Sequence, residues 1–187
     1  MNTNTRELIL GAARRTAQAH GYGGLNFRDL AKDVGIKAAS IHYYFPSKAD
    51  LGAAVARRYR DDAAAALQAL SDETPDPIEC LRRYPETFRT ALQNENRMCL
   101  GSFMAAEYDD LPDAVAKEVQ SFAEVNIAWI GRHLSAASLV AAEDSERRAR
   151  AIFAAIAGAQ LLARSRSDIC FYDSAIESYR EAGLLPA

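Results

Sequence analysis

The stretch from residue 27 to residue 51 holds cations, hydroxyls and an imidazole at close spacing. Lys37, Ser40, His42 and Tyr43 fall within seven residues and offer hydrogen-bond donors and a positive charge. Such groups bind phosphate oxygens and the edges of bases when one short element presents them together. A plain surface position remains the alternative for His42.

Local signals predict a first short helix before this cluster. The side-chain oxygen of Asn26 is suited to accept a hydrogen bond from a free N–H of the first helical turn. The apolar residues of segment 27–34 recur at three- and four-residue intervals, which places them on one helical face. Gly35 tolerates the left-handed conformation of a helix C-cap, so we expect the helix to end there.

A second short helix is predicted from Lys37 to Tyr44, with Ile41, Tyr44 and Phe45 facing inward. Pro46 ends it and Ser47 caps the helix that follows. Helix, glycine turn and short helix form the helix-turn-helix pattern, whose second helix enters the major groove of DNA. The residues left facing the groove are Lys37, Ala38, Ala39, Ser40, His42 and Tyr43.

In this stretch the chain resembles the TetR family of transcriptional regulators. The resemblance rests on Ala31 and Gly35, on the run SIHYYFPSK from Ser40 to Lys48, and on Leu51. It covers the first third of the chain in motif detail, and beyond that only length and helical character. It implies groove-facing positions for Ala38, Ala39, Ser40, His42 and Tyr43, a phosphate clamp at Lys48, and a DNA contact of some members at Arg28.

Two alanines in the groove imply few hydrogen bonds to bases, although they suit contacts with thymine methyl groups. Specificity then falls on His42, Lys37 and Arg28, or on the shape of the DNA. Because one such head reads only a few base pairs, a palindromic operator read by a homodimer is expected.

The charge of the chain is unevenly distributed. The formal net charge is −3, but residues 1–60 hold ten Lys or Arg and four Asp or Glu, a net of +6. The remainder is net −9. This asymmetry indicates a basic head that meets phosphate and an acidic body that does not.

Composition and periodicity predict an all-α fold of about nine helices. The 187 residues are 49% hydrophobic, and few stretches alternate as strands do. The predicted division is a helix-turn-helix domain at residues 1–47, extending to about 64 with the linking helix, and a helical effector-binding and dimerisation domain at 48–187. One helix is expected from Ile78 to Asn94, with a kink or a shifted start at Pro85.

The family resemblance implies that the second domain binds a small molecule that releases DNA. Its expected pocket combines apolar walls with a few polar groups, and the apolar wall indicates a hydrophobic or aromatic effector. Asn126 and His133 lie seven residues apart and are expected to share a face, bonded to each other or to water. Ordinary core packing is the alternative for the aromatic residues. The candidates are Phe88, Phe103, Glu107, Phe122, Asn126, Trp129 and His133.

The three cysteines, Cys80, Cys99 and Cys170, are widely spaced and form no C-x-x-C pair, which fits a reducing cytosol. Cys99 follows Arg97 near a predicted helix start, and both features favour a thiolate. A repressor that senses electrophiles or oxidants through Cys99 is therefore an alternative function. The competing interpretation is that Cys99 is a buried structural thiol.

A dimer face is predicted on the last two helices. Small residues in segment 151–159 allow close helix approach, and Ile169, Tyr172, Ile176 and Tyr179 form a stripe suited to a four-helix bundle. The alternative is that these stripes pack only against their own subunit.

Other classes of protein are less well supported. No nucleophile elbow, zinc-protease helix, P-loop or dinucleotide fingerprint occurs, so an enzyme is not expected. No metal site, cofactor or membrane span is predicted, and the expected location is the cytoplasm. A helical interaction protein without operator binding remains an alternative, although the basic head argues against it. The expected function is a ligand-responsive repressor.

Overall fold

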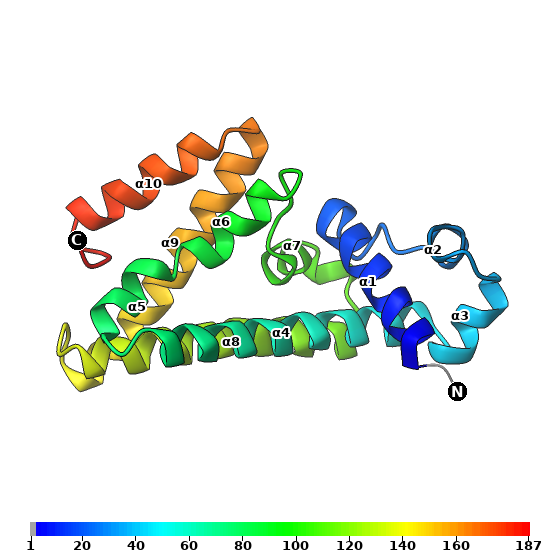
Figure 1. The fold of residues 1–187 in the computed structure, drawn as a ribbon, viewed down its shortest axis with the longest axis horizontal. Coiled ribbons are helices and arrows are strands. Elements are labelled where there is room, and N and C mark those ends of the chain that lie inside the picture. Colours follow the sequence, from blue (N-terminus) through cyan, green and yellow to red (C-terminus); the bar gives the residue numbers. More distant parts are fainter. Residues whose placement is uncertain (1–2) are drawn as a thin grey trace. The chain divides into compact units, whose positions relative to one another are not determined.

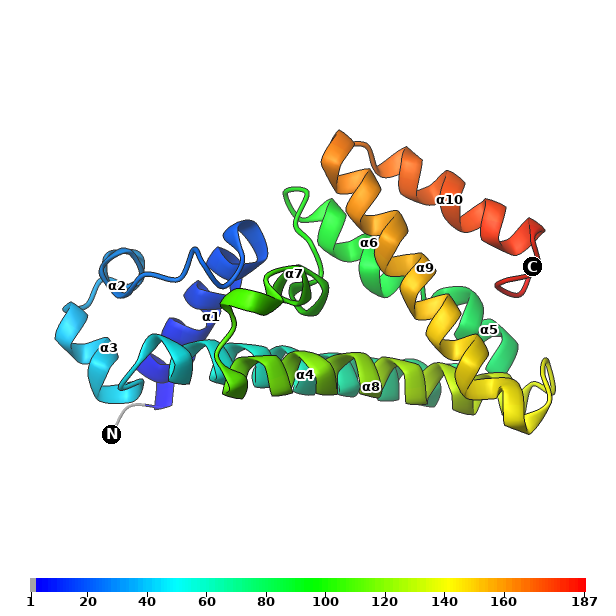
Figure 2. The ribbon, with the colours of Figure 1, turned by 180° about the vertical axis from the view of Figure 1, so that it is seen from behind.

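The structure is a computed structural model that describes residues 3–187, and these are all helix, turn and loop with no strand. Figures 1 and 2 show the ribbon from two opposite sides. No helix of these residues is long and apolar enough to cross a membrane. The elements are α1 (Thr3–His20), α2 (Phe27–Val34), α3 (Ala38–Tyr44), α4 (Lys48–Glu73), α5 (Pro77–Arg83), α6 (Glu86–Gln93), α7 (Leu100–Ala106), η1 (Tyr108–Asp110), α8 (Asp113–Ala136), η2 (Ala142–Asp144), α9 (Ser145–Arg166) and α10 (Ile169–Glu181).

The chain folds as two compact units, and neither is a single continuous stretch. Unit 1 comprises Met1–Asp62 and Leu100–Phe122, whereas unit 2 comprises Ala63–Cys99 and Ala123–Ala187. The long helices α4 and α8 therefore each contribute one part to unit 1 and one part to unit 2.

The core of unit 1 is built from the inner faces of six helices. Ile9, Leu30, Ile41 and Leu51, one from each of α1 to α4, are all 1% exposed or less. The same core continues through fully buried residues of the second stretch, namely Leu100, Met104 and Val115. Segment 100–122 therefore completes the core on which the first three helices rest.

Unit 2 is organised around buried aromatic residues. The rings of Tyr84 and Trp129 stack with centroids 5.5 Å apart, and Phe88 meets Tyr84 edge-on at 5.9 Å. Helix α9 adds its buried side, including Gln160, which accepts a hydrogen bond from the Cys99 amide (3.0 Å) and donates one to the Phe88 carbonyl (2.7 Å). These bonds satisfy a fully buried amide side chain.

The expected break at Pro85 divides segment 78–94 into two helices, α5 and α6. Pro85 takes helical angles (φ −57°, ψ −26°) directly before α6, but a proline has no N–H to continue the ladder of α5. Its carbonyl accepts a hydrogen bond from the hydroxyl of Tyr172 on α10 (2.7 Å). This hydrogen bond holds the start of α6 to α10 within unit 2.

The apolar stripe of α10 packs within unit 2. The prediction that it lies in a dimer face is therefore wrong for its two buried side chains, Tyr172 and Ile176. Tyr172 is 1% exposed and Ile176 is 4% exposed. The half-buried Tyr179 donates a hydrogen bond to the Ala155 carbonyl of α9 (3.3 Å). Burial against α6 and α9 already uses these side chains, so of the two helices α9 is the one that exposes large apolar side chains, Leu161 and Leu162.

Candidate functional site

Helix α2 is bounded by the two caps that the sequence predicts. The Asn26 side chain accepts hydrogen bonds from the amides of Arg28 (2.8 Å) and Asp29 (3.3 Å). Gly35 is left-handed, with φ 75°, and its amide bonds back to the end of α2. Both predicted boundaries of α2 are confirmed, and the turn at Gly35 leads into α3.

Helix α3 buries one side and presents the other to solvent. Ile41 and Phe45 are buried and Tyr44 is half-buried, as expected. The outward side carries the candidates for DNA contact: Lys37, Ala39, His42 and Tyr43 are exposed, whereas Ala38 and Ser40 are half-buried.

Two of the outward rings are held by aromatic neighbours. The His42 ring meets the Phe27 ring edge-on with centroids 4.6 Å apart, and its Nδ1 lies 3.4 Å from the Pro46 carbonyl oxygen. Tyr43 is 62% exposed and meets Tyr44 edge-on at 5.2 Å. These contacts restrict the rotamers before any partner binds, which lowers the entropic cost of an interface.

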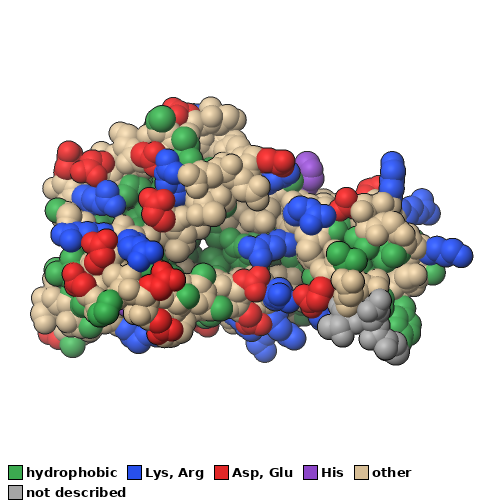
Figure 3. Space-filling view, viewed as in Figure 1, with side chains coloured by type: hydrophobic (Ala, Val, Ile, Leu, Met, Phe, Trp, Pro, Cys, Tyr) green, Lys and Arg blue, Asp and Glu red, His purple; other side chains and the backbone are tan. Residues whose placement is uncertain are grey.

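Arg28 and Lys37 are exposed and take part in no ion pair within the described residues. Other cations of unit 1 are paired: Arg14 with Asp62 (2.8 Å) and Arg15 with Asp33 (2.9 Å). In Figure 3, Lys and Arg side chains project from the part of unit 1 that carries α2 and α3. Unpaired cations of this kind are available for phosphate.

Lys48 is partly engaged within the chain. Its Nζ donates to the Gly23 carbonyl (3.0 Å) and lies 4.7 Å from the centroid of the Tyr22 ring. Burial raises the pKa of the Tyr22 hydroxyl, consistent with a ring packed into the unit. The clamping of phosphate by Lys48 remains a prediction, and it would compete with these contacts.

Ser47 caps α4 in a reciprocal arrangement with Asp50. The Asp50 amide donates to Ser47 Oγ (3.1 Å), and the Ser47 amide donates to Asp50 Oδ2 (3.0 Å). Two free amides of the helix start are thereby satisfied, which confirms the predicted cap.

We expect Ser47→Ala to lower the free energy of unfolding by about 1 kcal/mol, the usual cost of losing an N-cap. Urea denaturation followed by circular dichroism measures this cost. Ser174→Ala is the control, because Ser174 is exposed within α10. Equal stability of the two variants would contradict the role of the cap.

A buried carboxylate joins α4 to α8 within unit 1. Glu118 accepts from Arg57 (2.7 Å) and Arg60 (2.5 Å), and its side chain is 11% exposed. The hydrogen bond to Asp61, together with the nearby charge of Glu118, raises the pKa of Arg60. Since a buried carboxylate must keep its partners, this pair of ion bridges fixes the register of the two helices.

The predicted effector residues fall into two separate sets. Phe88, Asn126, Trp129 and His133 belong to unit 2, whereas Phe103, Glu107 and Phe122 belong to unit 1. In unit 1, Phe122 packs on Tyr59 with centroids 5.3 Å apart, and Glu107 bonds to backbone amides of the α1–α2 turn. Their contact with an effector remains a prediction.

In unit 2 the polar members of the set are bonded, but not to each other. Asn126 accepts from the Tyr84 hydroxyl (2.8 Å), whereas His133 Nε2 lies 3.2 Å from Ser71 Oγ. Trp129 Nε1 donates to the same Ser71 oxygen (2.9 Å), and the rings of Trp129 and His133 are 3.9 Å apart. The expected pairing of Asn126 with His133 is replaced by two separate bonds.

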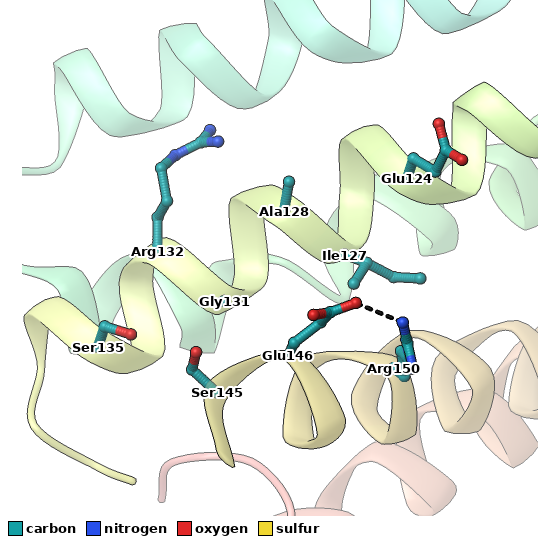
Figure 4. Close-up of a pocket in the computed structure, with 9 residues that line it drawn as sticks. All are labelled: Glu124, Ile127, Ala128, Gly131, Arg132, Ser135, Ser145, Glu146 and Arg150. Carbon is teal, nitrogen blue, oxygen red and sulfur yellow. Dashed lines mark hydrogen bonds and ion pairs between the residues drawn. The ribbon is translucent and has the colours of Figure 1, made fainter. Parts of the chain in front are cut away.

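An open groove of about 670 Å³ lies between α8 and the start of α9 in unit 2. Figure 4 shows Ile127 directed toward the Glu146–Arg150 ion pair, whereas Arg132 points away from α9. Sequence reasoning missed this groove, because its residues have the pattern of ordinary solvated helix faces. The lining is Glu124, Ile127, Ala128, Gly131, Arg132, Ser135, Ser145, Glu146 and Arg150.

Cys99 is a free thiol, 3% exposed, directly before α7. Arg97, the cation expected beside it, bonds to Glu95 (2.7 Å). A reactive role for Cys99 remains a prediction, and it requires the thiol to become accessible first.

Comparison with known proteins places this geometry in a family. Residues 9–55 match the model of bacterial regulatory proteins of the tetR family. A TetR transcriptional regulator from Legionella pneumophila has a similar crystal structure, with a TM-score of 0.89 and 33% identity over 97% of each chain. The chain belongs to the TetR family. A TetR-family regulator from Agrobacterium tumefaciens has a TM-score of 0.89 at 28% identity, covering 96% of this chain and 97% of that one.

Curated TetR-type relatives match over a shorter region. The HTH-type transcriptional repressor LfrR of Mycolicibacterium smegmatis is 34% identical over 84 residues, or 44% of this chain and 43% of that protein. The chain spans less than half the length of the curated relatives that it matches.

TetR-family proteins are transcription regulators that bind DNA and act as dimers. Membership confirms the family resemblance and the all-helical fold, and also that the chain is not an enzyme. The individual DNA contacts and effector residues of this TetR-family chain remain predictions.

Proposed function

We propose that the protein is a homodimeric, sequence-specific transcription regulator of the cytoplasm, and most simply a repressor. The observation that carries the proposal is α3, which buries Ile41 and, directly after its end, Phe45, while Lys37 at its N-cap, His42 and Tyr43 stay exposed. That side fits the major groove, and repression needs only that the bound protein block access to a promoter.

Within this proposal Arg28 and Lys37 bind phosphate. Replacing both with Ala is expected to weaken DNA binding and to make the salt dependence less steep, by about one in slope for each phosphate that is no longer neutralised. Gel shifts at several salt concentrations, on a duplex selected by the wild-type protein from a random pool, measure both quantities.

The matched control is Arg132→Ala with Arg147→Ala, which removes two positive charges from exposed positions of unit 2. Equal slopes for the two double variants would show that Arg28 and Lys37 act only through net charge. A wild-type protein that enriches no palindrome would overturn the proposed function itself.

The proposed dimer face is the outer side of α9. Leu161 and Leu162 are 52% and 50% exposed, and a Cβ added at Gly158 would meet only open space. An apolar face with a glycine on it allows two helices to approach closely. A second copy of the chain brings a second head, as a palindrome requires.

The proposed effector is a small hydrophobic or aromatic molecule that contacts Phe88, Asn126, Trp129 and His133. Tyr84 joins Phe88, Asn126 and Trp129 into one cluster with His133, so a ligand inserted there would disturb several contacts at once. A coupling of about 1–3 kcal/mol between effector and operator is typical. Trp129 is the sole tryptophan, so quenching of its fluorescence offers a direct screen of candidate ligands.

A further inference from the structure

The turn between α1 and α2 is bound by a carboxylate from a distant part of unit 1. Glu107 Oε2 accepts a hydrogen bond from the Tyr22 amide (2.6 Å), and Oε1 accepts one from the Gly23 amide (3.2 Å). Two consecutive amides that point at one anion form a backbone nest, and here the chain supplies the anion itself.

Gly21 shows how closely the carboxylate and the turn fit together. A Cβ added at Gly21 would lie 2.2 Å from Glu107 Oε2, a distance that no relaxed structure allows. Its backbone is also left-handed, with φ 69°. The position therefore needs glycine both for its conformation and for the approach of Glu107.

The opposite side of the turn is bound by the start of α4. Lys48 donates to the Gly23 carbonyl (3.0 Å), so the Gly23 residue is held by its amide on one side and its oxygen on the other. Three residues later Asn26 caps α2, which carries Arg28. The position of the turn thus sets the entry of the chain into the helix-turn-helix.

We infer that Glu107 is a positioning residue for DNA binding, which holds the α1–α2 turn so that α2 and α3 present their outward sides in one fixed arrangement. The inference rests on the proposed function. In the sequence, Glu107 lies in segment 100–122, which unit 2 flanks at both ends. Any movement of this segment that withdraws the carboxylate would free the turn.

The loss of a negative charge and the loss of positioning predict opposite changes in DNA affinity for the same substitution. Removing a negative charge from the protein favours its association with phosphate, so electrostatics alone predicts tighter binding for Glu107→Gln and Glu107→Ala. Loss of positioning predicts weaker binding. Asp109→Asn is the matched control, because it removes the same charge from an exposed position on η1, two residues away.

The test uses the full-length protein and the duplex that wild type selects from a random pool. Glu107→Ala is expected to bind about tenfold more weakly than Asp109→Asn, the order expected when charge-assisted hydrogen bonds are removed. Glu107→Gln keeps one acceptor oxygen, so its DNA affinity should lie between those of the other two variants. Gly21→Ala should weaken binding by more in wild type than in the Glu107→Ala background, where no carboxylate is left to displace and only the cost of the left-handed backbone remains.

Hydrogen exchange at the Tyr22 and Gly23 amides gives a readout independent of DNA. Glu107→Ala should accelerate exchange at these two amides and leave the α1 amides of Ala12 and Ala13 unchanged. Unchanged exchange at the turn would overturn the contact. If Glu107→Ala accelerates exchange at the turn but binds DNA as tightly as Asp109→Asn does, the positioning role is overturned. If wild type selects no duplex, the proposed function fails together with that role, while exchange still decides the contact.

Discussion

Replacing Leu161 and Leu162 with Glu is expected to produce a monomer that no longer holds its operator. Both side chains are half exposed on the outer side of α9, beside Gly158 and Ala154. Four carboxylates at the centre of a two-fold apolar interface would be desolvated without partners, which outweighs the burial that forms the dimer. Loss of the second head should lower operator affinity by roughly 10²–10⁴-fold.

Sedimentation equilibrium measures the oligomeric state, and a gel shift on the selected duplex measures affinity. Leu139→Glu is the control, since Leu139 is 44% exposed but lies outside α9. A double variant that remains dimeric would place the interface elsewhere. A monomer that keeps wild-type affinity would contradict the need for two heads.

Trp129→Ala is expected to be the most destabilising single substitution in unit 2. The ring is 2% exposed, stacks on Tyr84, and donates to the Leu67 carbonyl (3.0 Å) and to Ser71 Oγ. Removing a large buried aromatic side chain costs about 3–5 kcal/mol of unfolding free energy. Urea denaturation followed by circular dichroism measures the loss, because the substitution removes the sole tryptophan.

Trp129→Phe separates packing from hydrogen bonding. It keeps an aromatic ring against Tyr84 but removes the indole donor from the Leu67 carbonyl, which still accepts from the Ser71 hydroxyl (3.1 Å), so the lost hydrogen bond costs about 0.5–1.5 kcal/mol. We therefore expect Phe to recover part of the stability that Ala loses. A cost below about 1 kcal/mol for Trp129→Ala would show that the aromatic cluster does not hold unit 2 together.

Much of the local structure could be predicted because its causes are local. Asn26, Gly35 and Ser47 act within a few residues of their own positions, so their neighbours in sequence are also their partners in space. Asp168 caps α10 in the same manner, accepting from the Cys170 amide (2.9 Å). Caps and glycine turns therefore place helix ends reliably from sequence.

The long-range contacts could not be predicted, because no periodic pattern encodes them. Glu107 reaches an amide 85 positions away, and from sequence it had the features of a polar group in an apolar segment. Asn126 and His133 share a helix, but each bonds to a different element, Tyr84 or Ser71. One sequence fixes which side chains share a face, whereas tertiary packing decides which partner each of them meets.

The discontinuity of unit 1 has a consequence for how the protein is made. Leu100, Met104 and Val115 belong to the same core as Ile9 and Ile41, although a whole stretch of unit 2 separates them in sequence. A ribosome releases the amino-terminal helices first, but their covering residues emerge much later. Part of the apolar surface of the amino-terminal helices therefore stays exposed on the nascent chain until residues 100–122 have been synthesised. An excised amino-terminal fragment would keep that surface permanently bare.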